Sequence, residues 1–184
     1  FLVNDDILKK IVDLAALDGT DDVLEIGPGI GTLTVALLQH ARSVISIEFD
    51  PDLPAVLAET TALWADSFAL IENDALNVSA ADVESAFARV HAGAGEGVVD
   101  STQAAPEPSA RSFPNKLVAN LPYAVAATVV LDYFQRFDAL ESMTVMVQRE
   151  VADRMMAQPG VKDYGAFTVK LSLYVQPAGR FPVG

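Results

Sequence analysis

Short apolar runs alternate along the chain with longer segments whose apolar residues recur at helical spacing. Residues 4–17 show the helical pattern, and Asn4 precedes it as an N-cap. The apolar runs predict buried strands at 23–26, 43–48, 68–72, 115–120 and 143–148. Further helices are expected at 32–39, after Pro51, and at 79–91, 124–136, 150–157 and 165–174, and residues 175–183 are expected to begin a sixth strand.

Strands that alternate with helices predict an α/β domain, with a mostly parallel sheet covered by helices on both faces. Ligands of such sheets bind beyond the carboxyl ends of the strands, near the point where the strand order switches. The ends of the predicted strands are therefore the places where functional residues are expected.

Residues 92–114 interrupt this alternation, because they are rich in Gly, Ala, Ser and Pro and have no apolar period. Such a composition predicts a flexible surface insertion. The rest of the 184 residues, 51% of them hydrophobic, is enough for the core of one domain spanning 1–184.

The composition excludes several kinds of site. The chain has no cysteine, so disulfides, zinc–thiolate sites and thiol nucleophiles are excluded, and His40 and His91 have no partners at the spacing of a metal site or a catalytic triad. We therefore expect no metal. No apolar run reaches the ~18 residues that span a bilayer, and no basic-then-apolar signal peptide opens the chain. We expect a cytoplasmic protein without a membrane partner.

The charge is unevenly distributed. The net charge is −13, but residues 1–110 hold 19 acidic and 4 basic residues, whereas residues 111–184 hold 6 acidic and 8 basic residues. The acidity therefore belongs to the first part of the chain, where a solvated acidic surface is its simplest explanation. The second part is close to neutral and can still face the phosphates of a nucleic acid.

A glycine-rich segment, EIGPGIG at 25–31, directly follows the first predicted strand. Gly27 and Gly29 allow a tight turn and the close approach of a ligand to the backbone. The dinucleotide-binding pattern would need a third glycine where Thr32 stands. Glu25 is expected at the mouth of this loop, where its carboxylate would repel a pyrophosphate. It favours a ligand with cationic groups, such as S-adenosylmethionine, which carries a sulfonium, an ammonium and no phosphate.

Two further acidic residues fit other parts of the same ligand. Glu48 ends the second predicted strand, where open α/β folds place an acid that accepts both ribose hydroxyls. Asp74 follows the third, where its carboxylate can accept the exocyclic amine of an adenine while the N–H of Ala75 meets a ring nitrogen. With Gly27, these residues predict sites for an amino-acid tail, a ribose and an adenine.

The most specific motif is Asn120, Leu121, Pro122 and Tyr123, at the end of the fourth predicted strand. An Asn side-chain oxygen and a backbone carbonyl can accept both N–H groups of an exocyclic amine and stabilise positive charge that develops on its nitrogen. Tyr123 offers a ring on which a flipped base can stack. This motif predicts alkylation of an exocyclic amine without a metal or a strong general base.

Over nearly its whole length, the sequence resembles the ribosomal RNA adenine N6,N6-dimethyltransferase family. The matching segments are FL at 1–2, EIGPGIG at 25–31, IEFD at 47–50, NDA at 73–75, NLPY at 120–123 and QREVADRM at 148–155. The resemblance implies a Rossmann-like class I S-adenosylmethionine-dependent methyltransferase. It also implies cofactor contacts at Leu2, Gly27, Glu48, Asp74 and Asn120, with Asn120 shared between the cofactor and the target amine.

Leu121 and Tyr123 favour the branch of the family that dimethylates adenosines of small-subunit (16S-type) ribosomal RNA in ribosome biogenesis. A precursor of the small subunit is the expected substrate, because proteins usually recognise folded RNA by its shape. Nothing in the sequence demands more than a monomer. Ala124 and Ala127 depart from the Asn and Ser that the family commonly has there. The sequence is also expected to lack two N-terminal cofactor-binding residues and the small helical C-terminal domain that helps the family bind RNA.

Three alternatives remain open at this point. One is a large-subunit ribosomal RNA adenine methyltransferase that confers antibiotic resistance, where NIPY or NIPF is more usual than NLPY. Another, from a different class, is a non-catalytic ribosome-assembly or transcription factor on the same fold, which the intact NLPY motif disfavours. The third is a small-molecule or DNA amino-methyltransferase, although DNA enzymes tend to carry Asp-Pro-Pro-Tyr where this chain has NLPY.

Overall fold

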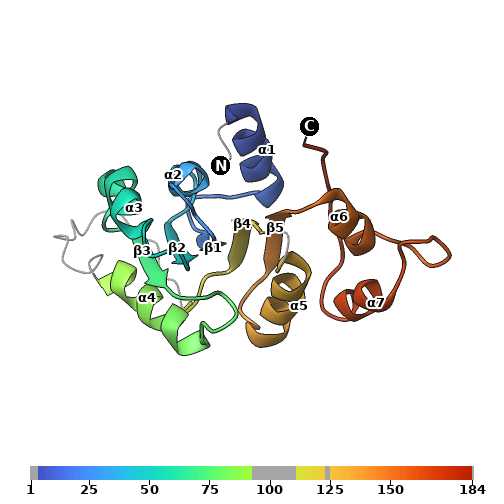
Figure 1. Cartoon of the computed structure of the whole chain (residues 1–184). Helices are drawn as coiled ribbons and strands as arrows, with labels where there is room; N and C mark the ends of the chain where they lie inside the picture. Colours follow the sequence, from blue (N-terminus) through green and yellow to red (C-terminus); the bar gives the residue numbers. More distant parts are fainter. Residues whose placement is uncertain (1–3, 93–110, 123–124, 184) are drawn as a thin grey trace, which may run out of the picture.

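The computed structural model describes residues 4–92, 111–122 and 125–183. In these ranges the chain forms a sheet of five parallel strands in the order β3-β2-β1-β4-β5, with helices on both faces (Figure 1). The strands are β1 Asp22–Ile26, β2 Ser43–Glu48, β3 Phe68–Glu72, β4 Lys116–Asn120 and β5 Ser142–Met146. The α/β architecture expected from the alternation of strands and helices is confirmed.

The helices before, between and after the strands follow the predicted order. They are α1 Asp5–Ala15, α2 Thr32–Leu38, α3 Pro54–Thr60, α4 Ala80–Ala92, α5 Ala126–Arg136, α6 Arg149–Met155 and α7 Ala166–Ser172, with a 3₁₀ turn at Ala62–Trp64. Asn4 caps α1 as predicted, because its side chain accepts hydrogen bonds from the N–H groups of Asp6 and Ile7. None of the helices in the described ranges is long and apolar enough to cross a membrane.

Two apolar layers enclose the sheet, and alternate residues of its central strands supply them. Val23 and Val44 pack against α1 and α2 on one face. Leu24 and Ile45, the next residues along, pack against α4, α5 and α7 on the other. All four are fully buried. Since both faces of these strands are covered, their sequences are apolar at nearly every position, which is why they stood out as continuous runs.

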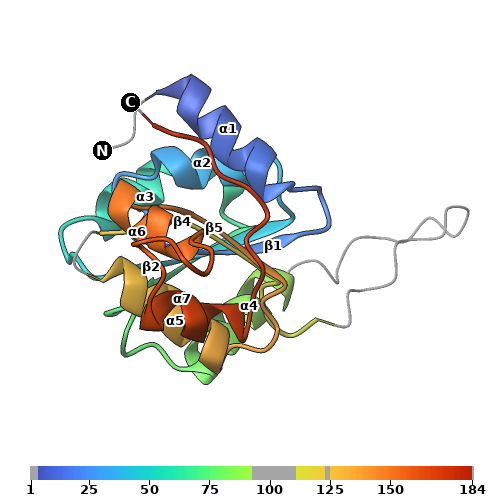
Figure 2. The same cartoon turned by 90° about the vertical axis from the view of Figure 1, so that its right-hand side faces the viewer.

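The segment after α7 differs from the prediction, because residues 175–183 form no strand. Pro177 and Pro182 have no N–H to donate to a ladder, and Gly179 between them is a poor strand former. The segment instead lines a groove of about 1370 Å³ beside β5. Phe181 packs against the α1–α2 core, so this part of the chain runs alongside α1 (Figure 2).

The ends of the expected insertion belong to the folded domain. Helix α4 extends to Ala92, and Phe113 is buried with its ring 5.2 Å from that of Phe137. Residues 93–110, which make up the rest of the insertion, lie outside the described residues.

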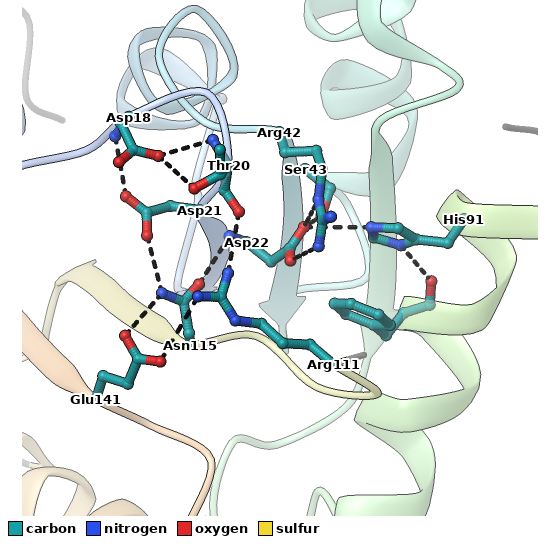
Figure 3. Close-up of polar contacts among 11 residues, drawn as sticks. Asp18, Thr20, Asp21, Asp22, Arg42, Ser43, His91, Arg111, Asn115 and Glu141 are labelled. Carbon is teal, nitrogen blue, oxygen red and sulfur yellow. Dashed lines mark hydrogen bonds and ion pairs between the residues drawn. The ribbon is translucent and has the colours of Figure 1, made fainter. Parts of the chain in front are cut away.

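A polar network lies at the end of the sheet where the strands begin (Figure 3). The fully buried Asp22 accepts two hydrogen bonds from Arg42, one from the hydroxyl of Ser43 at 2.7 Å, and lies 3.3 Å from His91 Nε2. The side chain of Asn115 accepts from the N–H of Asp22. These contacts tie the starts of β1, β2 and β4 to the end of α4.

Replacing Asp22 by Asn tests this network. The change removes the buried charge that pairs with the partly exposed Arg42, so we expect the free energy of unfolding to fall by about 3 kcal/mol. Urea denaturation followed by circular dichroism measures it. Asp13→Asn is the matched control, because Asp13 pairs with Lys9 at the exposed surface and its loss should have no measurable effect. Equal stability of the two variants would contradict the structural role of the network.

Candidate cofactor and methyl-transfer site

The predicted functional residues meet at one edge of the sheet. Gly27, Glu48, Asp74 and Asn120 end or follow β1, β2, β3 and β4, which are neighbours in the sheet and run parallel. Their carboxyl ends therefore share one edge, opposite the polar network. The strand order switches between β1 and β4, where ligands of open α/β sheets bind.

The loop after β1 has the backbone that its glycines predict. Gly27, Gly29 and Gly31 have φ angles of +69°, +61° and +91°, in the left-handed region that other residues rarely adopt. The N–H of Gly27 donates to the carbonyl of Ile47 at 2.9 Å, which extends the β1–β2 pairing into the loop. A Cβ atom at Gly27 would have no neighbour within 4 Å, so the space in front of this residue is open to a ligand.

Glu48 ties the loop to β2. One carboxylate oxygen accepts from the N–H of Gly29 at 3.2 Å, and the other accepts from the N–H groups of Phe49 and Asp50, each at 2.9 Å. The residue is 8% exposed. A carboxylate has about four acceptor positions, so these three bonds leave capacity for a ribose hydroxyl.

The turn after β3 presents Asp74 and Ala75. One oxygen of Asp74 accepts from the N–H of Leu76 at 2.9 Å, and its other oxygen accepts no hydrogen bond from the described residues. The buried hydroxyl of Tyr133, on α5, donates to the carbonyl of Ala75 at 2.8 Å. Arg136, one turn further along α5, donates to the carbonyl of Val78 at 2.7 Å.

Tyr133 and Arg136 are contributors that the sequence reasoning did not identify. Tyr133 is fully buried, and burial raises the pKa of its hydroxyl, so it stays a neutral donor to the turn. The only signal in the sequence was a tyrosine on the apolar face of a predicted helix, a position that ordinary core packing explains equally well.

Asn120 ends β4 opposite Met146 of β5. The next residue, Leu121, is 2% exposed, and its N–H donates to the carbonyl of Met146 at 3.1 Å. The carbonyl of Pro122 accepts from the N–H groups of Val125 and Ala126, which starts α5 directly behind the motif. Both ends of Asn120–Pro122 are therefore fixed by the fold. Two other predicted site residues, Tyr123 and Leu2, lie outside the described residues.

Glu25 lies deeper than the sequence suggested. Its side chain is buried rather than at the loop surface, with 1% exposed. Oε2 accepts from the hydroxyls of Thr34 and Ser46, each at 2.7 Å, and Oε1 has no partner among the described residues. Burial raises the pKa of Glu25 to about 7, because lost hydration outweighs these hydrogen bonds, and the charge of Glu48 adds to the rise.

The acids at this edge have no basic partner in the part of the chain that the structure describes. The ion pairs between described residues involve neither Glu25 nor Glu48. The same residues contain no cluster of three His, Cys, Asp or Glu side chains that could hold a metal ion. The edge therefore combines a backbone cradle with acids that have no basic partner.

Comparisons with known proteins agree with this geometry. Residues 1–178 match the model of the family described as ribosomal RNA adenine dimethylase. The chain is 36% identical to the ribosomal RNA small subunit methyltransferase A of Lachnoclostridium phytofermentans, over 96% of this chain and 53% of that protein. It is 38% identical to the protein of the same name from Corynebacterium diphtheriae, over 95% of this chain and 51% of that protein. The chain thus spans about half the length of these curated relatives.

Solved structures share the fold. A dimethyladenosine transferase from Plasmodium falciparum matches 94% of this chain and 52% of that one, with a TM-score of 0.69 and 25% identity. The 23S rRNA methyltransferase ErmE matches 85% of this chain and 51% of its own, with a TM-score of 0.60 and 26% identity. The expected class I, Rossmann-like methyltransferase fold is confirmed. By its sequence and by its fold, this chain belongs to the ribosomal RNA adenine dimethylase family.

Proposed function

We propose that this chain is the catalytic domain of an enzyme that uses S-adenosylmethionine to dimethylate N6 of adenosines in small-subunit ribosomal RNA. The observation that carries the proposal is the meeting of the glycine loop, Glu48, Asp74 and Asn120 at the ends of four adjacent strands. The names of the curated relatives support the small subunit as the source of the RNA.

The residues at this edge fit the cofactor. The open space in front of Gly27 suits its amino-acid tail, and the buried, partly unpartnered Glu25 suits a ligand that brings positive charge. Glu48 would hold the ribose, while the free oxygen of Asp74 would accept the adenine amine as the N–H of Ala75 donates to the ring. Leu2 and Gly29 complete the proposed contacts.

When bound, S-adenosylmethionine supplies an activated methyl group on its sulfonium. The chain supplies alignment and charge stabilisation. The side-chain oxygen of Asn120 and the carbonyl of Leu121, which Pro122 fixes, would accept the two N–H groups of the target amine. Positive charge that develops on the amine nitrogen would then face acceptors already in place. Tyr123 would stack on the flipped base.

The proposed partner is ribosomal RNA within a precursor of the small subunit, and we propose that the protein acts there as a monomer in the cytoplasm. The fold gives the uneven charge of the sequence a spatial meaning. Strands β2 and β3, from the acidic part, lie at one side of the sheet, and β4 and β5, from the part with more basic than acidic residues, at the other (Figure 1). RNA is therefore proposed to approach from the side of β4, β5 and α6.

The variant Asp74→Asn tests the cofactor site. The amide keeps an oxygen for the N–H of Leu76 but turns an N–H₂ group toward the adenine amine, so we expect binding of S-adenosylmethionine to weaken about 10- to 100-fold. Isothermal titration calorimetry measures it. Asp52→Asn, an exposed neighbour of Glu48 with the same charge change, is the control and should bind as the wild type does. Wild-type affinity in Asp74→Asn would contradict the adenine contact.

The variant Asn120→Ala tests the chemistry. Loss of one preorganised acceptor should lower the rate constant of methyl transfer about 10²- to 10³-fold. The assay uses the full gene product that contains these residues, unmethylated small subunits and radiolabelled cofactor, with N6,N6-dimethyladenosine identified by mass spectrometry. Asn77→Ala, an exposed Asn→Ala change, should retain activity.

Two outcomes of this assay would reject the proposal in different ways. Methylation of large-subunit RNA in preference to small subunits would replace the proposed substrate. Binding of the cofactor without methylation of either subunit would favour the non-catalytic assembly factor.

A further inference from the structure

Glu25 is a buried carboxylate at the cofactor edge to which the proposed function assigns no hydrogen bond with the cofactor. It lies two residues before Gly27, and its side chain is enclosed by the first turn of α2 and by β2. Two hydroxyls donate to Oε2, while the buried Oε1 has no partner among the described residues. An anionic carboxylate left in this state carries a large desolvation cost.

The charged groups around Glu25 add to that cost. Glu48 reaches the same edge from β2, two residues beyond Ser46, which pairs with Glu25 in the sheet. Helix α2 contains no charged residue. On β4, Lys116 binds Asp21 and the carbonyls at the end of α1, at the far end of the sheet. The described neighbours thus offer Glu25 negative charge and no positive charge.

We propose that Glu25 is a charge-sensing positioning residue, which holds a proton in the cofactor-free protein and releases it when the cationic cofactor binds. The inference rests on the proposed function. The carboxylic acid loses its proton to solvent, and the carboxylate that remains is stabilised by the cations of the ligand on the glycine loop. A raised pKa of about 7 for Glu25 in the empty protein agrees with this geometry.

Proton release makes cofactor affinity depend on pH in a defined direction. Below the pKa of Glu25 in the empty protein, binding must first remove the proton, so affinity increases as the pH rises. With a pKa of about 7, the association constant should rise about fivefold between pH 6 and pH 7. This interval lies below the range of about 7.7–8.0 in which an α-amino group, such as that of the cofactor, titrates.

The measurement is titration calorimetry of the whole chain with S-adenosylmethionine, in buffers of different ionisation enthalpy. The wild type should release about nine tenths of a proton per cofactor at pH 6 and about half a proton at pH 7. The variant Glu25→Gln keeps an acceptor for Thr34 and Ser46. It should release almost no proton on binding the cofactor, and its association constant should not show the fivefold rise between pH 6 and pH 7. Glu72→Gln, an exposed carboxylate at the end of β3, is the control and should behave as the wild type does.

A neutral ligand separates charge sensing from simple closure of the pocket. Methylthioadenosine keeps the adenine and the ribose but has a neutral thioether in place of the sulfonium and carries no cation, so its binding to the wild type should release no proton. This comparison needs no variant and stays decisive if Glu25→Gln fails to fold. Equal proton release with both ligands, or cofactor binding without proton release at pH 6, overturns the inference. Failure of the cofactor to bind at any pH rejects the proposed function itself.

Stability of the empty protein gives an independent check. Since the folded state holds the proton of Glu25 more tightly than the unfolded chain, this residue makes the protein less stable as the pH rises from about 4.5 to about 7. We therefore compare the melting temperatures of the wild type and Glu25→Gln. The wild-type value minus the variant value should fall between about pH 4.5 and about pH 7 and stay constant above pH 7. A constant difference throughout would show that Glu25 does not hold a proton in the folded protein.

Discussion

The parallel pairing of β1 with β2 on one side and β4 on the other governs the rest of the structure. It sets Asp22 and Ser43 side by side where these strands begin, and Ile26 and Ile47 where they end. Since every strand points the same way, each connection must return across a face of the sheet. Residues as distant in sequence as Gly27 and Asn120 consequently meet at one edge, and the candidate site is a result of strand direction more than of any local motif.

The same constraint explains which parts of the fold could be predicted. Strands buried on both faces must be apolar at nearly every position, so their runs were visible in the sequence, and their ends located Glu48, Asp74 and Asn120. Residues 175–183 have an apolar composition too, but a strand also needs N–H donors, which Pro177 and Pro182 lack. Apolar content alone could not distinguish a segment that pairs as a strand from one that only packs its side chains against the core.

Contacts between side chains distant in sequence were beyond prediction for a different reason. The hydroxyl of Tyr133 meets the carbonyl of Ala75 only because the fold brings α5 beside the turn after β3, and no periodicity in the sequence encodes that meeting. The burial of Glu25 could not be predicted for the same reason. A residue just before a glycine loop was expected at its surface, whereas the pleat of β1 turns this side chain inward, beneath Thr34.

Asp22 and Glu25 show how one strand divides stability from function. Both carboxylates are buried on β1, three residues apart. Asp22, where the strand begins, is neutralised by Arg42 and approached by His91, so its burial ties β1, β2 and α4 together. Glu25, near the strand's end, accepts from two hydroxyls and has no cationic partner among the described residues, although an added Lys or Arg would lower the cost of its burial. A basic residue there would also repel a cationic ligand. The missing partner at Glu25 is thus what a cofactor site requires, and the compensated pair at Asp22 supports the strand that carries it.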